Sequence, residues 1–242
     1  MTVLDPACQA DEYRSTWDGY NVAMCLKNKK ATLDAVLKSG WKMDYVRFML
    51  DPYWFCDLTS YDGEHYFYIN FDFERFKKYL EELFLPLSDY YHEKGIYTLL
   101  FPPLQTPEII EVGDDFQQHM LLVWDYVSRH PRIRNNPGVM FELANEPTSF
   151  TCKQTDDYIN YVSLFKNSIS SFKEIKDYWQ PIVDRIRSHC DNIIYVPGQT
   201  YQSDFSGFAD FPVEGGNIGY AVHWYPGWWG NMRKDWEDHV SL

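Results

Sequence analysis

Short apolar runs alternate along the chain with longer segments in which apolar residues recur every three or four positions. The runs predict strands over 19–24, 45–50, 96–101, 139–145, 192–196 and 218–224. The longer segments predict helices over 30–39, 73–94, 115–130 and 177–189. Strands separated by helices indicate βαβ units and a parallel sheet.

Two architectures contain such units. A doubly wound open sheet is disfavoured, because no Gly-x-Gly-x-x-Gly follows the first strand and no phosphate-binding loop motif occurs. Each strand instead ends in an aromatic, polar loop, as expected where such loops build one functional face. We therefore predict a single α/β domain over residues 1–242, a (β/α)8 TIM barrel of which this chain supplies about six βα units.

The charge balance excludes some partners. The 242 residues contain 22 Lys and Arg against 35 Asp and Glu, for a net charge of -13, so no basic face for nucleic acid is expected. No apolar run reaches the ~18 residues of a membrane span. The start, residues 1–6, lacks a basic and then apolar signal pattern, so an export signal is expected to have been removed or never present.

The five cysteines are widely spaced and include no Cys-x-x-Cys pair. We therefore expect no metal site and no cofactor. Buried thiols are the favoured interpretation, and one or two disulfides of an exported protein are the alternative.

Aromatic residues form 18% of the chain and cluster with Pro, Gly and acidic residues over 51–55 and 223–229. Flat rings with polar tips suit stacking on sugar faces, although a single ring is more often part of a core. Two of four tryptophans are expected to bind sugar in this way: Trp54, Trp224, Trp228 and Trp229.

The most informative segment is Asn-Pro-Gly-Val-Met-Phe-Glu-Leu-Ala-Asn-Glu-Pro over 136–147. With this segment the chain resembles glycoside hydrolase family 5, the cellulase-like family of retaining (β/α)8 glycosidases. Three further matches occur in the family's order, Gly-Tyr-Asn at 19–21, Tyr-Val-Arg-Phe at 45–48 and His-Trp-Tyr at 223–225. The resemblance covers about residues 17–230.

The resemblance implies roles for five residues. Glu146 is the expected general acid/base, and Asn145 beside it suits the sugar 2-OH. Arg47 is expected to bind the anionic nucleophile, with a structural ion pair to Glu142 as the alternative. His223 is expected to contact the sugar or the catalytic pair, with a core histidine as the alternative, and Tyr225 to hydrogen-bond the nucleophile.

The residues themselves support the role of Glu146. Glycoside cleavage needs a carboxylic acid to protonate the leaving oxygen, and Pro147 ends the strand just after this carboxyl. Partial burial would raise its pKa, as a proton donor requires. Glu142 alternates onto the same strand face, deeper in the barrel, and is interpreted as a buried structural group.

Two features depart from the family pattern. The family's third strand usually ends in a loop that contains a histidine, whereas residues 100–105 at the end of the strand predicted over 96–101 contain none. The shape of the negative subsites is therefore expected to differ from that of the family. The family's nucleophile, a glutamate ending strand seven, is not expected in this chain, since neither Glu214 nor Glu237 ends a predicted strand. A truncated gene or a metagenomic fragment is one explanation. A complementary polypeptide that supplies strands seven and eight along exposed strand edges is another.

The sequence thus predicts a retaining, endo-acting hydrolase of β-1,4-linked polysaccharide or oligosaccharide, of the cellulose or β-glucan type. A β-mannanase, a xyloglucanase and a carbohydrate-binding protein without catalysis are the alternatives. Because such polymers do not enter cells, a secreted, periplasmic or cell-surface location is expected.

Overall fold

The computed structural model describes residues 22–49, 73–102, 109–147, 149–151 and 169–223. Its contacts divide the chain into two compact units. The first comprises residues 1–104 and 136–141, and the second comprises 105–135 and 142–242. The single domain stays a prediction. In the described part of the chain, no helix has the length and apolar character to cross a membrane.

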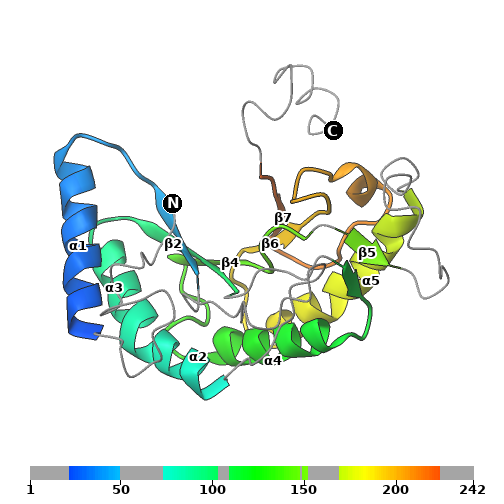
Figure 1. Ribbon diagram of the computed structural model, residues 1–242, viewed down its shortest axis with the longest axis horizontal. Coiled ribbons are helices and arrows are strands. Elements are labelled where there is room, and N and C mark those ends of the chain that lie inside the picture. Colours follow the sequence, from blue (N-terminus) through cyan, green and yellow to red (C-terminus); the bar gives the residue numbers. More distant parts are fainter. Residues whose placement is uncertain (1–21, 50–72, 103–108, 148, 152–168, 224–242) are drawn as a thin grey trace, which may run out of the picture. The chain divides into compact units, whose positions relative to one another are not determined.

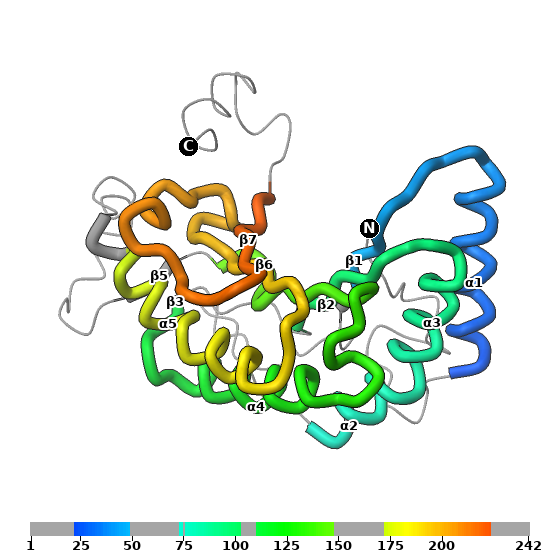
Figure 2. The backbone as a smooth tube through the Cα atoms, turned by 180° about the vertical axis from the view of Figure 1, so that it is seen from behind, coloured from blue at the N-terminus to red at the C-terminus, as the bar shows by residue number. Residues whose placement is uncertain are grey.

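The first unit contains three parallel strands. β1 (Tyr45–Met49) pairs with β2 (Tyr97–Phe101), which pairs with β4 (Val139–Glu142). β2 is buried from Thr98 to Phe101, as expected for a parallel strand covered on both faces. Helices α1 (Val22–Lys38) and α3 (Leu85–Glu93) pack against each other in this unit (Figures 1 and 2).

The helix predicted over 73–94 contains a wide turn. α2 (Phe73–Tyr79) continues through a π-helical segment, Leu80–Phe84, into α3. There the N–H of Leu85 donates to the carbonyl of Leu80, five residues back. Pro86, at the start of α3, has no N–H and its ring would press on the carbonyl four residues earlier. A wider turn accommodates that ring.

The first predicted strand is wrong where the structure describes it. Residues 19–21 lie outside the described part, and Val22–Met24 form the start of α1. No Gly or Pro interrupts the sequence from Val22 to Lys38, and the helix buries Cys25 and Leu33. Helical packing of that face overrides the short β-like pattern.

The second unit contains the next part of the parallel sheet. Leu143, just after β4, donates its N–H to the carbonyl of Tyr195 in β6 (Ile194–Pro197). β6 pairs in parallel with β7 (Ile218–Ala221). A separate parallel pair is formed by two short strands, β3 (Ile109–Glu111) and β5 (Ser149–Thr151). A 3-10 turn, Ser206–Ala209, lies between β6 and β7.

Helices α4 (Asp115–Arg129) and α5 (Ile169–Arg187) lie side by side in this unit (Figures 1 and 2). Each buries a stripe of residues at helical spacing, and the largest side chains include Trp124 from α4 and Trp179 from α5. Asp114 caps α4 by accepting the N–H of Gln117 at 2.7 Å. These contacts make the helix pair the main core of the second unit.

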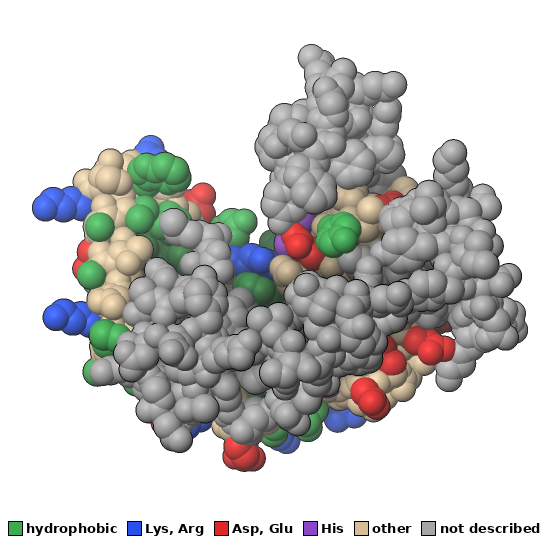
Figure 3. Space-filling model, viewed as in Figure 1, with side chains coloured by type: hydrophobic (Ala, Val, Ile, Leu, Met, Phe, Trp, Pro, Cys, Tyr) green, Lys and Arg blue, Asp and Glu red, His purple; other side chains and the backbone are tan. Residues whose placement is uncertain are grey.

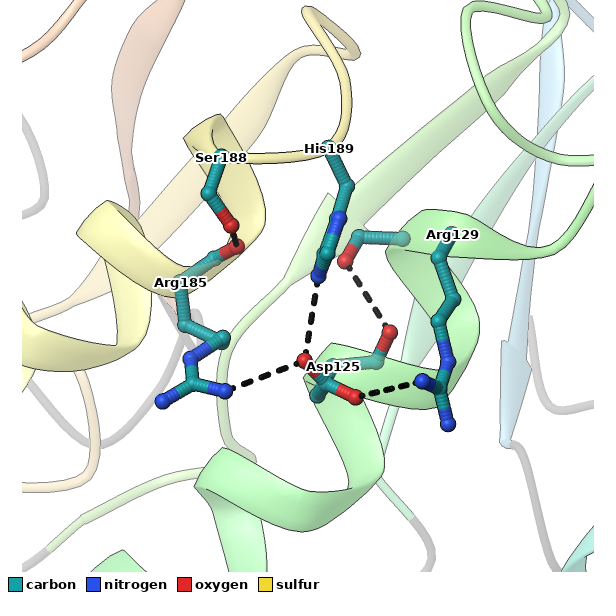
Figure 4. A network of polar contacts seen from close by, with 6 residues as sticks. Asp125, Arg129, Arg185, Ser188 and His189 are labelled. Carbon is teal, nitrogen blue, oxygen red and sulfur yellow. Dashed lines mark hydrogen bonds and ion pairs between the residues drawn. The ribbon is translucent and has the colours of Figure 1, made fainter.

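A cluster of polar side chains connects α4 to the end of α5 (Figure 4). The Asp125 carboxylate of α4 lies 3.2 Å from the Arg185 guanidinium of α5, 3.0 Å from the His189 ring and 3.4 Å from Arg129. Burial alone raises the pKa of Asp125, but hydrogen bonds from His189 and Arg185 outweigh it and hold that pKa below its ordinary value. The cluster therefore favours the ionised carboxylate and joins α4 to α5.

Replacing Asp125 with Asn is expected to lower the free energy of unfolding by about 1 kcal/mol, because one partly buried acceptor serves three cationic or hydrogen-bonding groups. Urea unfolding at pH 7 measures the change. Asp177→Asn is the matched control, since its pair with Lys173 is exposed and a loss of only a few tenths is expected. Equal losses in both variants would contradict the role of the cluster.

His119 of α4 gives a pH prediction. Burial lowers the pKa of His119 from 6.5 to about 4. The unfolded chain therefore binds a proton below pH 6.5 that the folded chain does not, and stability is lost as pH falls toward 4. His119→Gln is expected to remove about 3 kcal/mol of this pH dependence between those values. Urea unfolding across the range measures it, and an unchanged slope would show that this histidine is not its source.

Candidate active site

Glu146 lies in the loop that follows β4. This strand ends at Glu142, and the buried residues Leu143 and Ala144 continue the chain. The Leu143 carbonyl accepts the indole N–H of Trp124 at 3.3 Å, which ties the loop to α4. Glu146 then adopts a positive φ of 48°, so its side chain is aimed by a left-handed backbone and not by strand alternation.

A second unusual segment follows β6. Thr200, Tyr201 and Gln202 have φ values of 54°, 56° and 60°, three successive left-handed residues without a glycine. Such a conformation costs roughly 1–2 kcal/mol per residue. The Tyr201 N–H donates to the carbonyl of Pro147 at 3.0 Å, so this turn is bound directly to the Glu146 loop. We call residues 200–202 the left-handed turn.

The side chain of Gln202 connects the left-handed turn to Glu142 and Glu146. This side chain is fully buried. Its Oε1 accepts the main-chain N–H of Glu146 at 2.6 Å, and its Nε2 donates to Glu142 Oε1 at 3.1 Å. Its main-chain carbonyl accepts the N–H of His223 at 3.0 Å. One residue thus contacts all three of the site's titratable residues.

His223, which follows β7, lies between the two carboxylates. Its Nδ1 is 2.8 Å from Glu146 Oε1, and its Nε2 is 3.2 Å from Glu142 Oε1. The side chains of Glu146 and His223 are 25% and 16% exposed, whereas that of Glu142 is 1% exposed. Figure 3 shows a place where a histidine adjoins acidic side chains at the surface, in keeping with this partial exposure. Glu142, Gln202, Glu146 and His223 form a closed ring of contacts, hereafter the four-residue ring.

The protons of this ring can be counted. A neutral imidazole has one N–H and one acceptor nitrogen, whereas an ionised carboxylate only accepts. Two ring nitrogens facing two carboxyl groups therefore need two protons between the three residues. Either His223 is an imidazolium between two carboxylates, or it is neutral and one carboxyl is protonated. Both arrangements have a net charge of −1 and differ by the shift of one proton along a hydrogen bond.

The structure brings together two of the predicted site residues, Glu146 and His223, and it places Asn145 beside Glu146 with a partly exposed side chain. The predicted burial of Glu142 is confirmed. Arg47 belongs to the first unit, where its guanidinium lies over the Phe101 ring at 3.7 Å. Five predicted residues lie outside the described part: Trp54, Trp224, Tyr225, Trp228 and Trp229.

Sequence reasoning missed Gln202. Nothing marks this glutamine as special, since it belongs to no motif and the left-handed turn contains neither Gly nor Asn. A weak signal was present, because residues 199–204 directly follow a predicted parallel strand, where loops of this architecture build the functional face.

Comparison with known protein families places these residues in context. A family model described as Cellulase (glycosyl hydrolase family 5) matches residues 8–241. An endoglucanase of Bacillus sp. (strain KSM-635) is 33% identical over 105 residues, which are 43% of this chain and 10% of that protein. An endoglucanase of Halalkalibacter akibai is 34% identical over 98 residues, 38% of this chain and 11% of that protein. The matched segments thus span about a tenth of these relatives.

Two solved structures show the same fold. A beta-glucanase from Saccharophagus degradans has a TM-score of 0.53 and 20% identity, with 87% of this chain and 57% of that chain covered. A glycoside hydrolase 5 lichenase from Caldicellulosiruptor sp. F32, in complex with cellotetraose, has a TM-score of 0.53 and 16% identity, with 91% and 59% covered. The predicted α/β fold of the (β/α)8 class is confirmed.

The left-handed turn gives a stability prediction. Tyr201 is 51% exposed, and its main-chain N–H contact does not depend on the side chain. Tyr201→Asn is expected to keep or raise the free energy of unfolding, by up to about 1 kcal/mol, because Asn tolerates a positive φ. Tyr201→Val is expected to lower it by about 1–2 kcal/mol, because a branched Cβ does not. Urea unfolding of both variants tests this, and Val as stable as Asn would contradict it.

Proposed function

Because the chain belongs to glycosyl hydrolase family 5, we propose that it is the catalytic part of a retaining endo-acting β-1,4-glucanase, with Glu146 as general acid/base. The observation that carries the proposal is the Glu146 carboxyl, partly buried in the loop after β4 and hydrogen-bonded to His223 at 2.8 Å. A carboxyl in this position has a fixed orientation and is still open to a ligand.

The mechanism is a double displacement. A nucleophilic carboxylate attacks the anomeric carbon while Glu146 protonates the departing glycosidic oxygen. Glu146, now a carboxylate, then takes a proton from the water that releases the sugar. Asn145, beside Glu146, suits the sugar 2-OH as both donor and acceptor. The nucleophile stays the prediction made from the resemblance, a glutamate at the end of a later strand.

The substrate class is proposed from the relatives. The two curated relatives above are named endoglucanases, which supports a β-glucan of the cellulose type. β-Mannan and xyloglucan are the alternatives, because loops set specificity in this fold. Since such polymers lie outside cells, the proposal includes a secreted, periplasmic or cell-surface location. A complementary polypeptide along the strand edges stays a prediction from the sequence.

Glu146→Gln is expected to lower kcat/KM on a soluble β-1,4-glucan by about 10²–10⁴, because general acid catalysis contributes on that order. The variant is assayed in the full-length protein that contains this chain, by release of reducing ends. On an aryl β-cellobioside with a dinitrophenol leaving group, which departs without protonation, kcat/KM is expected to fall far less. Added azide is expected to restore turnover by replacing water in the second step.

The control is Asp177→Asn, an exposed change on α5 that is expected to leave both rates unchanged. Binding of the glucan without any release of reducing ends by the unmodified protein would favour a carbohydrate-binding protein instead. Equal losses on both substrates in Glu146→Gln would contradict the acid/base assignment. Parallel assays with β-mannan and xyloglucan decide the substrate.

A further inference from the structure

We propose that Glu142 and Gln202 are positioning residues that hold His223 in the tautomer which keeps the catalytic proton on Glu146. This inference rests on the proposed function and deepens it. In the four-residue ring, the main-chain N–H of Glu146 is a group that can only donate, and it fixes the orientation of its neighbours in turn.

The orientation of Gln202 follows first. A main-chain N–H only donates, so the side-chain atom 2.6 Å from Glu146 N is the amide oxygen. The amide nitrogen is therefore the atom that faces Glu142, at 3.1 Å, and it too only donates. Glu142 Oε1 must accept at that contact.

The tautomer of His223 follows next. Glu142 Oε1 lies 3.1 Å from the Gln202 amide and 3.2 Å from His223 Nε2, so two donors converge on one buried oxygen. An ionised carboxylate oxygen satisfies both. Neutral His223 then carries its hydrogen on Nε2, which leaves a lone pair on Nδ1.

That lone pair determines where the second proton resides. Nδ1 lies 2.8 Å from Glu146 Oε1, and an acceptor nitrogen in this position needs a hydrogen on the carboxyl. In the arrangement with a neutral His223, Glu146 is thereby the neutral acid, and the imidazolium arrangement differs from it only in that the same proton lies on Nδ1. After the proton has moved to the glycosidic oxygen, a carboxylate oxygen faces a lone pair. This repulsion strengthens Glu146 as the base that then takes a proton from water.

The alternative is a purely structural Glu142, as the sequence suggested. Its burial and its two hydrogen bonds are compatible with that role, and its removal would then lower stability or lower activity on all substrates alike. A role through His223 makes a different prediction. The defect should be confined to the step that needs a proton from Glu146.

Glu142→Gln is the first test, because it keeps the volume and removes the charge. In the full-length protein, kcat/KM on soluble β-1,4-glucan is expected to fall at least about 30-fold. On the dinitrophenyl β-cellobioside a fall of less than about 3-fold is expected, since that leaving group needs no acid.

The pH profile is the second readout. Three titratable groups face one another here, Glu142 from β4, Glu146 from the following loop and His223 after β7. Removing the negative charge of Glu142 makes loss of the Glu146 proton easier, because a like charge no longer opposes it. The basic limb of kcat/KM on glucan is therefore expected to move to lower pH by about one unit. A limb at the wild-type pH would overturn the proposal.

A second variant keeps the proposal testable if Glu142→Gln does not fold. Gln202→Met keeps a similar unbranched side chain and removes both polar contacts, and a smaller defect of the same kind is expected, about 10-fold on glucan only. Asp177→Asn is the matched surface control. Thermal unfolding followed by circular dichroism establishes that each variant is folded.

Glu146→Gln, measured in parallel, distinguishes failure of the proposed function from failure of the positioning role of Glu142 and Gln202. If it shows no difference between the two substrates, the proposed function fails. If it shows the difference while the folded variants Glu142→Gln and Gln202→Met lose activity equally on both substrates, the function stands and this inference is wrong.

Discussion

The imidazole of His223 lies between two carboxyl groups of very different exposure, and this bridge is the contact on which the site depends. It joins the end of β4, the loop that follows it and the segment after β7. Glu142 is buried and Glu146 is partly exposed, so one carboxyl is isolated from water while the other can meet a ligand. Because the three residues share two protons, moving a proton at one of them changes the hydrogen bonds of the other two.

The bridge needs a rigid support, and the main chain supplies it. Leu143 pairs with β6, Trp124 binds the Leu143 carbonyl, and the Tyr201 N–H binds Pro147. These bonds come from helix α4, strand β6 and the turn after β6, so the loop that contains Glu146 is held from several directions. A carboxyl placed by such a frame loses little conformational freedom when a substrate binds.

The sequence predicted much of this arrangement, for reasons that can be stated. Continuous apolar runs placed β1, β2, β4, β6 and β7, and the stop signals after them placed their functional ends. The Asn-Glu-Pro motif predicted Glu146 as the acid/base candidate, and strand alternation correctly predicted the burial of Glu142. The helical state of Val22–Met24 was missed, since a short apolar run is ambiguous between strand and helix without its packing partner. The convergence of Glu142 and Glu146 on one histidine was also missed, because a left-handed residue between strand and proline is not visible in periodicity.

Gln202 shows why the rest of the site could not be predicted from the sequence. Four non-glycine residues of the site have a positive φ, Glu146 and the three residues of the left-handed turn. At about 1–2 kcal/mol each, their strain is large beside the ~5–15 kcal/mol by which a domain is stable. If stability alone determined the sequence, Gly or Asn would be expected at these positions, and the turn could then be predicted from the sequence. In this chain the residue types suit the site instead. Gln202 supplies one acceptor, to the N–H of Glu146, and one donor, to Glu142, while its backbone adopts an unfavourable conformation. Because Gln202 takes the place of a typical turn residue, the sequence around the four-residue ring carries no turn signal from which it could be predicted.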